Sequence, residues 1–309
     1  MQIDSLIYVA GHTGLVGSAI VRALRDRGYK NLLLREQKDL DLIEQAAVAA
    51  FFERERPEYV FLVAARVGGI HANDSYPADF IYENLMIEAN VIRAAWRAGV
   101  KKLLFTGSSC IYPRLAPQPI KEEYLLSGPL EPTNEWYSIA KIAGIKLAQA
   151  HRKQHGFKAI CAMPANLYGP GDNFDLKTSH VIPALIRKFH EARQAAAPEA
   201  VVWGTGTPRR EFLHVDDLAD ALLFLMHRYD ESGIINVGTG EDVTIRELCE
   251  IVRDVVRYNG RIVFDSSMPD GTPRKLLDVS RIRSLGWQPK TPLKEGIEQS
   301  YRWYRSTLG

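Results

Sequence analysis

The run Tyr8-Val-Ala-Gly11-His-Thr-Gly14-Leu-Val-Gly17 decides the fold of this chain. Its first residues form a short apolar strand, and its glycines stand where that strand must turn into a helix. Glycine permits a tight turn and lets the backbone approach a pyrophosphate, while a helix N-terminus offers free N–H groups and partial positive charge. The GxxGxxG spacing therefore predicts a dinucleotide site, and a glycine turn that serves only chain packing is the alternative.

Short runs of β-forming residues alternate with longer amphipathic stretches through the first half of the chain. Such alternation is typical of right-handed βαβ units. It predicts an α/β fold with a Rossmann-type doubly wound parallel sheet. The expected strands are 6–10, 31–34, 59–64, 102–105 and 159–163, and the expected helices include 14–27, 42–56 and 84–98.

The strict alternation ends near Pro164, and loops rich in glycine, proline and asparagine follow at 168–173 and 269–273. We therefore expect a nucleotide-binding domain over residues 1–165 and a smaller α/β substrate lobe over 166–309. A segment near 212–235 is expected to return to the first domain. No internal repeat interrupts this organisation.

Composition excludes several kinds of function. The 309 residues include 39 basic and 37 acidic side chains, so the chain lacks the charge excess of a protein that binds nucleic acid or an anionic membrane. The cysteines Cys110, Cys161 and Cys249 lie far apart without CxxC spacing, which indicates neither a disulfide framework nor a metal site. No apolar run approaches 18 residues, and we expect a cytoplasmic protein.

The end of the second expected strand bears on cofactor choice. An acidic residue at this point commonly binds the ribose 2'-hydroxyl of NAD, but Arg35 stands at the first such position. Its guanidinium can pair with a 2'-phosphate, which favours NADP. In the alternative, Arg35 is a solvated surface residue, and Glu36 or Asp39 faces the ribose or adenine.

Three residues predict the chemistry of a carbonyl reductase. Tyr137 and Lys141 are four residues apart, so they share one face of a helix. A ketone that accepts a hydride needs a proton donor, and a phenol made more acidic by a nearby ammonium can supply the proton. Ser108, after the fourth strand, can donate a hydrogen bond to the same oxygen. The YxxxK pattern alone also fits an exposed tyrosine and a solvated lysine.

With the glycine turn, this serine, tyrosine and lysine resemble the extended short-chain dehydrogenases. Further segments, spread over almost the whole chain, resemble the GDP-L-fucose synthase family within that group. These segments are 107–113, 131–135, 139–146, 166–170, 179–184, 210–217 and 270–275.

The resemblance implies a reaction in two parts. That family epimerises carbons 3 and 5 of GDP-4-keto-6-deoxy-D-mannose and then reduces carbon 4 with NADPH. Both epimerised carbons flank the ketone, so Ser108 and Tyr137 can stabilise the enolate formed when a proton leaves. The resemblance assigns the base and acid to Cys110 and His180, whose ordinary pKa values lie within about two units of neutrality. A small buried hydrophobe and a hydrogen-bonded histidine are the alternatives.

The resemblance also implies the remaining site residues and a homodimer formed through helices of the first domain. Arg210 is expected at the rim of the cleft, where its guanidinium can hold a diphosphate through two hydrogen bonds. The chain departs from the family pattern at Thr13 and Lys188, where arginine is common. The expected substrate residues are Lys188, Trp203, Arg210 and Asp270, and the expected NADP residues are Gly11, His12, Thr13, Gly14, Leu15, Val16, Gly17, Arg35, Asp39, Leu40, Thr106, Gly107, Ser108, Ser109, Lys141, His180 and, beside the nicotinamide, Pro164, Ala165, Asn166 and Leu167.

Three other functions remain open at the level of sequence. A sister epimerase-reductase acting on a GDP-linked dideoxy sugar, as in colitose formation, or on a keto-heptose shares these motifs. A redox-neutral 4-epimerase would retain its nicotinamide through the cycle. A non-catalytic cofactor-binding sensor would not need Ser108, Tyr137 and Lys141 together.

Overall fold

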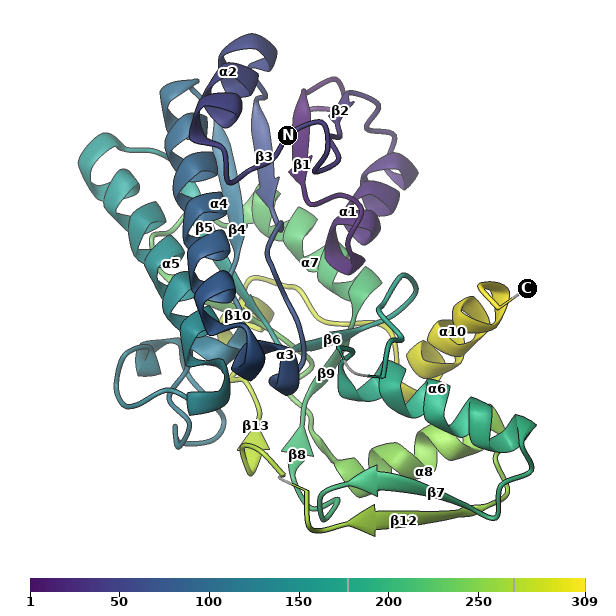
Figure 1. Ribbon diagram of the computed structural model, residues 1–309. Helices are drawn as coiled ribbons and strands as arrows, with labels where there is room; N and C mark the ends of the chain where they lie inside the picture. Colours follow the sequence, from purple (N-terminus) through teal and green to yellow (C-terminus); the bar gives the residue numbers. More distant parts are fainter. Residues whose placement is uncertain (177, 269, 309) are drawn as a thin grey trace.

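A six-stranded parallel sheet organises the computed structural model, which describes residues 1–176, 178–268 and 270–308 (Figure 1). The strand order is β10-β5-β4-β3-β1-β2, and the order reverses at β1, because β2 and β3 both pair with it. Crevices at such reversals are where doubly wound folds bind nucleotides. The strands are β1 (Ile7–Ala10), β2 (Leu32–Leu33), β3 (Tyr59–Leu62), β4 (Lys102–Thr106), β5 (Ala159–Pro164) and β10 (Ile234–Val237).

Helices cover both faces of this sheet. The helices α4 (Pro77–Arg97) and α5 (Glu135–His155) lie side by side on one face, with α2 (Gln45–Glu55) next to α4 (Figure 1). On the other face α1 (Leu15–Asp26) packs against α7 (Val215–Arg228). The predicted Rossmann-type fold is therefore confirmed.

Two details differ from the sequence prediction. Helix α4 begins at Pro77 rather than near residue 84, because proline at the first helical position needs no hydrogen-bond partner for its nitrogen. The sixth strand, β10, was not among the expected strands. It pairs with β5 through Ile234 and Cys161, and its four residues are buried.

The chain returns to this sheet after leaving it. Strand β6 (Asn166–Tyr168) pairs with β9 (Phe212–His214), which leads directly into α7 and then β10. His214 caps α7, because its Nδ1 atom accepts a hydrogen bond of 3.4 Å from the Asp216 backbone. Apolar residues of α7 and β10 belong to the same buried core as β1, β3, β4 and β5.

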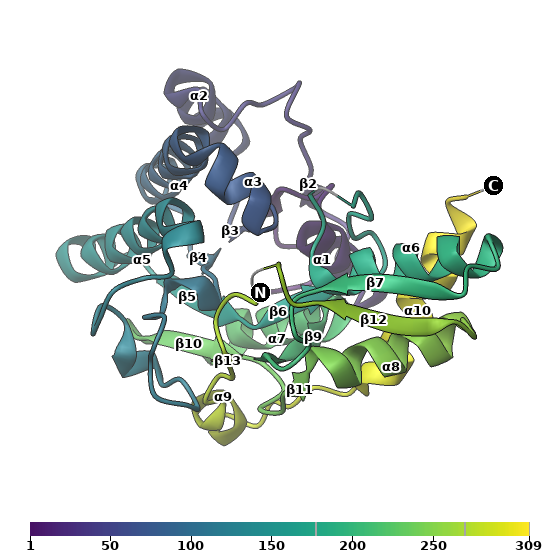
Figure 2. The same ribbon diagram turned by 60° about the horizontal axis from the view of Figure 1, so that its bottom comes forward.

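A second hydrophobic core, separate from the first, lies below the sheet in the view of Figure 1. It is built by α6 (Val181–Gln194), α8 (Ile245–Val256), α10 (Leu293–Ser306) and the parallel pair β7 (Glu199–Trp203) and β12 (Arg261–Asp265). Figure 2 shows β7 and β12 side by side over α8. A small sheet, β11 (Val243–Thr244), β8 (Arg209–Arg210) and β13 (Arg274–Lys275), stands next to these elements.

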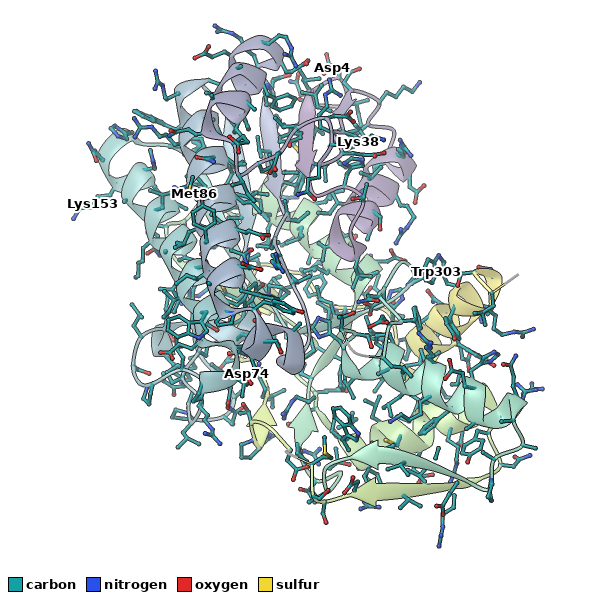
Figure 3. The ribbon with its side chains drawn as sticks, in the orientation of Figure 1. Asp4, Lys38, Asp74, Met86, Lys153 and Trp303 are labelled. Carbon is teal, nitrogen blue, oxygen red and sulfur yellow. The ribbon has the colours of Figure 1, made fainter. Side chains whose placement is uncertain are left out.

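Short helices make up the rest of the helical elements in the described residues. Charged side chains such as Lys38 and Lys153 point outward (Figure 3). No helix within 1–176, 178–268 and 270–308 is long and apolar enough to cross a membrane. The same residues contain no group of three histidine, cysteine, aspartate or glutamate side chains that could hold a metal ion. The short helices are α3 (Ile70–Ser75), η1 (Ser109–Ile111), η2 (Glu122–Tyr124), η3 (Pro132–Asn134) and α9 (Ser280–Ser284).

Candidate active site

The glycines of the turn from β1 into α1 differ in how much space surrounds them. Gly11 has a φ of +90°, and a Cβ atom there would stand 2.7 Å from the Cα atom of Ala64. A Cβ atom on Gly17 would stand 2.0 Å from the carbonyl oxygen of Gly11. Gly14 is different, because its added Cβ atom would meet only that same oxygen, at 3.6 Å. Gly11 and Gly17 close the turn, whereas Gly14 keeps the space above it open.

This turn fits a dinucleotide pyrophosphate. Gly14 is the N-cap of α1 and offers no side-chain acceptor to the first N–H groups, and the first turn holds no acidic residue. These N–H groups are therefore available to an anion. The buried Nδ1 atom of His12 also has no hydrogen-bond partner among the described residues. Thr13 is exposed, and Leu15 and Val16 are half-buried.

Arg35, two residues after β2, has two partners within the protein. Its Nη2 atom lies 3.2 Å from the Glu55 carboxylate of α2, and its Nη1 atom donates a 2.9 Å hydrogen bond to the Leu34 carbonyl. About a third of the side chain is exposed. Arg35 is thus paired within the protein, while Asp39 is exposed and Leu40 packs in the core.

The turn after β4 carries the candidate serine. Thr106 donates a 3.1 Å hydrogen bond to the Leu62 carbonyl, which fixes the end of the strand. A Cβ atom on Gly107 would stand 2.4 Å from the sulfur of Met163, so a larger residue there would require the Met163 side chain to move. Ser108 then caps η1 by accepting a 3.2 Å hydrogen bond from the Cys110 backbone, and Ser109 is buried.

Tyr137 and Lys141 lie on α5, facing this turn. The Lys141 ammonium lies 5.9 Å from the centre of the Tyr137 ring and 3.1 Å from the Glu88 carboxylate of α4. Burial raises the pKa of Tyr137 above its ordinary value, and the nearby Cys110 and Glu88 add to the rise, while Ser108 opposes it. The expectation of a more acidic phenol is therefore wrong for this arrangement, because burial dominates the pKa of Tyr137.

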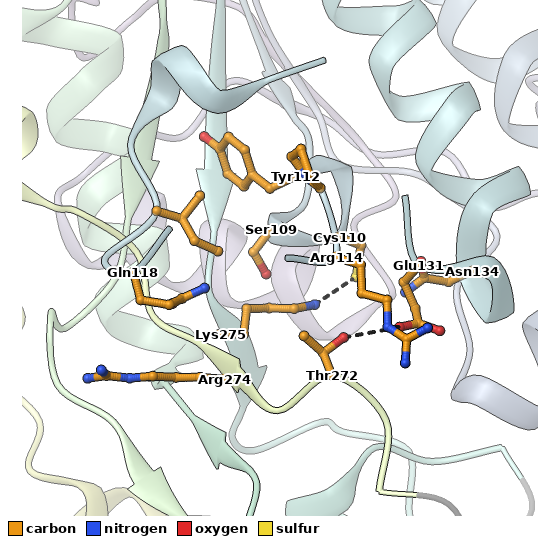
Figure 4. A pocket seen from close by; sticks show the side chains of 12 residues that line it. Ser109, Cys110, Tyr112, Arg114, Gln118, Glu131, Asn134, Thr272, Arg274 and Lys275 are labelled. Atoms are coloured by element: carbon orange, nitrogen blue, oxygen red, sulfur yellow. Dashed lines mark hydrogen bonds and ion pairs between the residues drawn. The ribbon is translucent and has the colours of Figure 1, made fainter. Parts of the chain in front are cut away.

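Cys110 lies between α5 and β13. The Lys275 ammonium of β13 stands 3.4 Å from its sulfur (Figure 4), and Ser138 of α5 holds its carbonyl through a 2.9 Å hydrogen bond. Burial favours the neutral thiol, but Lys275, Ser108 and Arg210 outweigh burial and lower the pKa of Cys110. The thiol is thus more acidic than an ordinary cysteine.

His180 is the N-cap of α6. Its side chain reaches the protein surface. The surrounding protein atoms still remove water from around the imidazole, which lowers its pKa, and the positive charge of Lys275 lowers the pKa further. The same lysine therefore influences both Cys110 and His180.

Cys110 lines a small pocket (Figure 4). Lys275 reaches into this pocket. It was not among the residues expected in the site, although it lies in the segment 270–275 that resembles the family. The other lining residues are Ser109, Tyr112, Pro113, Arg114, Gln118, Ile120, Glu131, Asn134, Thr272 and Arg274.

The expected substrate residues fall into two groups. Lys188 donates a 2.7 Å hydrogen bond to the Val201 carbonyl of β7, and Trp203, at the end of that strand, is 61% exposed. The Asp270 carboxylate accepts hydrogen bonds of 2.7 Å and 2.8 Å from the backbone and hydroxyl of Thr205, two residues after Trp203. Arg210 pairs in register with Lys275 and is half-buried, and the charges of both Cys110 and Asp270 act on it, so it lies between the two groups.

The turn after β5 is held at two points. The Ala165 nitrogen donates a 2.9 Å hydrogen bond to the Val237 carbonyl of β10, and the Asn166 amide donates a 2.8 Å hydrogen bond to the Glu211 carbonyl. Pro164 to Leu167 therefore lie at the carboxyl end of a central strand, as do the turns after β1 and β4. This edge is where doubly wound sheets bind nucleotides.

A glycine turn opening the first helix of a parallel sheet, with a serine after β4 and a tyrosine and lysine on α5, defines a short-chain dehydrogenase of the extended type. Residues 7–238 match the model of the NAD dependent epimerase/dehydratase family. The chain is 62% identical over 299 residues to "Probable GDP-L-fucose synthase 1" of Oryza sativa subsp. japonica, covering 96% of this chain and 91% of that one. The chain belongs to the NAD dependent epimerase/dehydratase family and, within it, to the GDP-L-fucose synthase family.

Solved structures agree in fold over the whole length. A GDP-6-OMe-4-keto-L-xylo-heptose reductase from C. jejuni superposes with a TM-score of 0.95 at 42% identity, covering 99% of both chains. A GDP-L-fucose synthetase from Naegleria fowleri bound to NADP superposes with a TM-score of 0.92 at 29% identity, covering 100% of this chain and 96% of that one.

Proposed function

We propose that this protein is a bifunctional epimerase-reductase that converts GDP-4-keto-6-deoxy-D-mannose into GDP-L-fucose, with NADPH as the reductant. One observation carries the epimerase half of the proposal: an acidified thiol, Cys110, shares a site with Ser108, Tyr137 and Lys141. A ketone reductase alone needs a proton donor for oxygen and has no use for a base aimed at carbon. A thiol with a lowered pKa is a base of that kind.

In the epimerisation, Cys110 and His180 act as the base and acid on opposite faces of the sugar ring. The base takes the proton from carbon 3 or carbon 5, and the electron pair of the C–H bond moves into an enolate on the 4-oxygen. Ser108 and Tyr137 donate hydrogen bonds to that oxygen. A proton returned on the opposite face inverts the carbon and restores the ketone.

In the reduction, NADPH supplies a hydride to carbon 4 when it is bound. The phenol of Tyr137 then gives its proton to the carbonyl oxygen, and Lys141 supplies positive charge beneath the ring as the phenol ionises. Ser108 holds the same oxygen throughout. The raised pKa of Tyr137 keeps the phenol protonated before the hydride moves.

The cofactor is assigned from the turn after β1 and from Arg35. The open space at Gly14 and the free N–H groups of α1 suit the pyrophosphate, and Arg35 at the end of β2 supports the choice of NADP. A family member with the same fold binds NADP. Lys188, Trp203 and Asp270 are proposed to hold the GDP moiety, and Arg210 the diphosphate next to Cys110.

The proposal extends to the domains, the assembly and the location. Residues 1–165, rejoined by a segment near 212–235, form the NADP domain, and 166–309 form the GDP-sugar domain. The exposed Tyr82 of α4, with Trp136 and Ile139 of α5, supports a homodimer through these two adjacent helices. The enzyme is proposed to work in the cytoplasm.

A second substrate has its own support. The C. jejuni reductase of a GDP-linked keto-heptose shares this fold almost completely. Its 42% identity is nevertheless well below the 62% identity to the rice relative, which favours the 6-deoxyhexose.

A direct assay decides among these substrates and functions. The purified protein is supplied with NADPH and, in separate reactions, the GDP-4-keto-6-deoxymannose and GDP-keto-heptose substrates. The proposal predicts stoichiometric NADPH oxidation and GDP-L-fucose as the product of the first reaction. Faster turnover of the heptose would support the sister reaction, and a nicotinamide that stays bound and is not consumed would support a 4-epimerase.

A further inference from the structure

The ammonium of Lys275 lies 3.4 Å from the Cys110 sulfur, although 165 positions separate the two residues along the chain. Its neighbour Arg274 instead forms an ion pair with Asp242. Two adjacent cations on one short strand therefore have different partners, one a carboxylate and the other a thiol.

The strand that carries Lys275 is fixed from two sides. Strand β13 pairs with β8 so that Lys275 lies opposite Arg210, and the Glu211 carboxylate accepts a 2.8 Å hydrogen bond from the Leu277 backbone. On the other side, Gln118 accepts a 2.8 Å hydrogen bond from the Leu276 backbone. The backbone on which the lysine stands is thus held in place before any sugar binds.

We infer that Lys275 is a positioning residue of the epimerase half-reaction, whose fixed ammonium, 3.4 Å from the sulfur, favours the thiolate form of Cys110 that removes the proton from carbon. The inference rests on the proposed function, since it names what prepares the base of that reaction. Lys275 itself transfers no proton.

The other two cysteines show burial outweighing nearby cations, since Arg152 acts on Cys161, and Arg246 and Lys188 act on Cys249. Burial raises the pKa of Cys161 and of Cys249 to about 12 in each case. Cys110 is half-buried and burial acts on it in the same direction, yet its pKa is lowered, with Lys275 the strongest of the opposing causes. A thiol at pKa 12 would be ionised in only about one molecule in 10⁵ at pH 7. The lowered pKa of Cys110 therefore makes its thiolate more available than that of either other cysteine.

Several charged or titratable groups surround the thiol and act on it together. Arg210 of β8 adds a second positive charge, and Tyr137 of α5 interacts electrostatically with Cys110. Lys275 also lowers the pKa of His180. The remaining charged groups around the pocket are Arg114, Glu131 and Arg274.

Alkylation of Cys110 by iodoacetamide measures the thiolate directly, because only the ionised sulfur reacts. The measurement needs neither sugar nor cofactor, so its failure is distinct from a failure of the proposed function. The reaction rate is followed from pH 5 to pH 10 in the full-length protein, and Cys110→Ala identifies the signal that belongs to this residue. Cys161 and Cys249, which are buried and weakly acidic, contribute little below pH 9.

Lys275→Met is expected to move the midpoint of the Cys110 profile up by at least one pH unit, with a roughly tenfold slower reaction at pH 7. Lys275→Arg keeps the charge and is expected to keep the midpoint close to that of the wild type. Lys290→Met, on an exposed lysine, is the matched control and should change nothing. Circular dichroism verifies that each variant is folded.

A Lys275→Met profile that coincides with the wild-type profile would overturn the inference. So would an Arg variant that shifts as far as the Met variant, because position rather than charge would then be responsible. When substrate is supplied, Lys275→Met should also lose deuterium exchange at the sugar carbons in proportion to the lost thiolate.

Discussion

The Nζ atom of Lys141 lies 3.1 Å from the Oε1 atom of Glu88, and the two side chains are 2% and 1% exposed. Gly144 permits this approach between α5 and α4, because a Cβ atom there would stand 2.4 Å from the other Glu88 oxygen. Burial raises the pKa of Glu88 to about 7 in spite of the ammonium. The pair therefore holds Lys141 near the Tyr137 ring. Removing both charges from water costs free energy, so the pair is not a source of folding stability.

The raised pKa of Glu88 predicts how stability changes with pH. The folded protein binds a proton there that the unfolded chain releases near its ordinary value of 4.5. This contribution to stability is complete below that value and is lost as the pH rises through about 7. Glu88→Gln, which resembles the protonated side chain, should remove the dependence.

The free energy of unfolding in urea, measured at pH 5 and pH 8, tests this expectation. Between the two values the wild type should lose on the order of 2 kcal/mol relative to Glu88→Gln. The exposed Glu53→Gln serves as the control and should follow the wild type. A constant difference between wild type and Glu88→Gln at both pH values contradicts the raised pKa.

Gly14→Ala and Gly17→Ala should fail in different ways. The added methyl of Gly14→Ala meets only an ordinary contact, so the protein should fold normally but bind NADPH at least about tenfold more weakly. The added methyl of Gly17→Ala would stand 2.0 Å from a backbone oxygen, so the fold itself should lose about 2 kcal/mol or more. Thermal denaturation and NADPH titration separate the two effects, and equal stability loss in both variants would refute the division of tasks.

Arg35 and Glu55 should affect cofactor preference in opposite directions. Arg35→Ala removes the guanidinium and should raise the KM for NADPH about tenfold, with little change for NADH, because only NADPH carries the 2'-phosphate. Glu55→Gln removes the carboxylate that now pairs with Arg35 and should lower the KM for NADPH. Initial rates with both cofactors provide the measurement, and parallel changes for NADPH and NADH would remove Arg35 from the phosphate site.

Tyr137→Phe should reduce ketone reduction by at least about 100-fold, because the developing alkoxide loses its proton donor. Cofactor binding should survive, since the turn after β1 is unchanged. The rate of NADPH oxidation with substrate present checks the first expectation, and NADPH titration checks the second. A variant that oxidises NADPH at the wild-type rate would show that another group supplies the proton.

The first five strands could be predicted because each is a β-rich run between helical stretches. Strand β10 escaped prediction because Ile234–Val237 is a short apolar run, which periodicity alone does not distinguish from part of a buried helix. Lys275 gave no signal of its own, since only the pairing of β13 with β8 brings it to Cys110. The direction of the Tyr137 pKa also depends on tertiary burial, which residue spacing does not contain.

We propose above that one site of this protein inverts two carbons and reduces a third. The most direct test supplies GDP-4-keto-6-deoxymannose and NADPH in deuterated water and locates deuterium in the product by NMR. We expect GDP-L-fucose carrying deuterium at carbons 3 and 5, and a Cys110→Ser variant that loses this label while still slowly reducing the unepimerised ketone. A product with no deuterium at these two carbons, or full labelling by Cys110→Ser, would contradict this proposal.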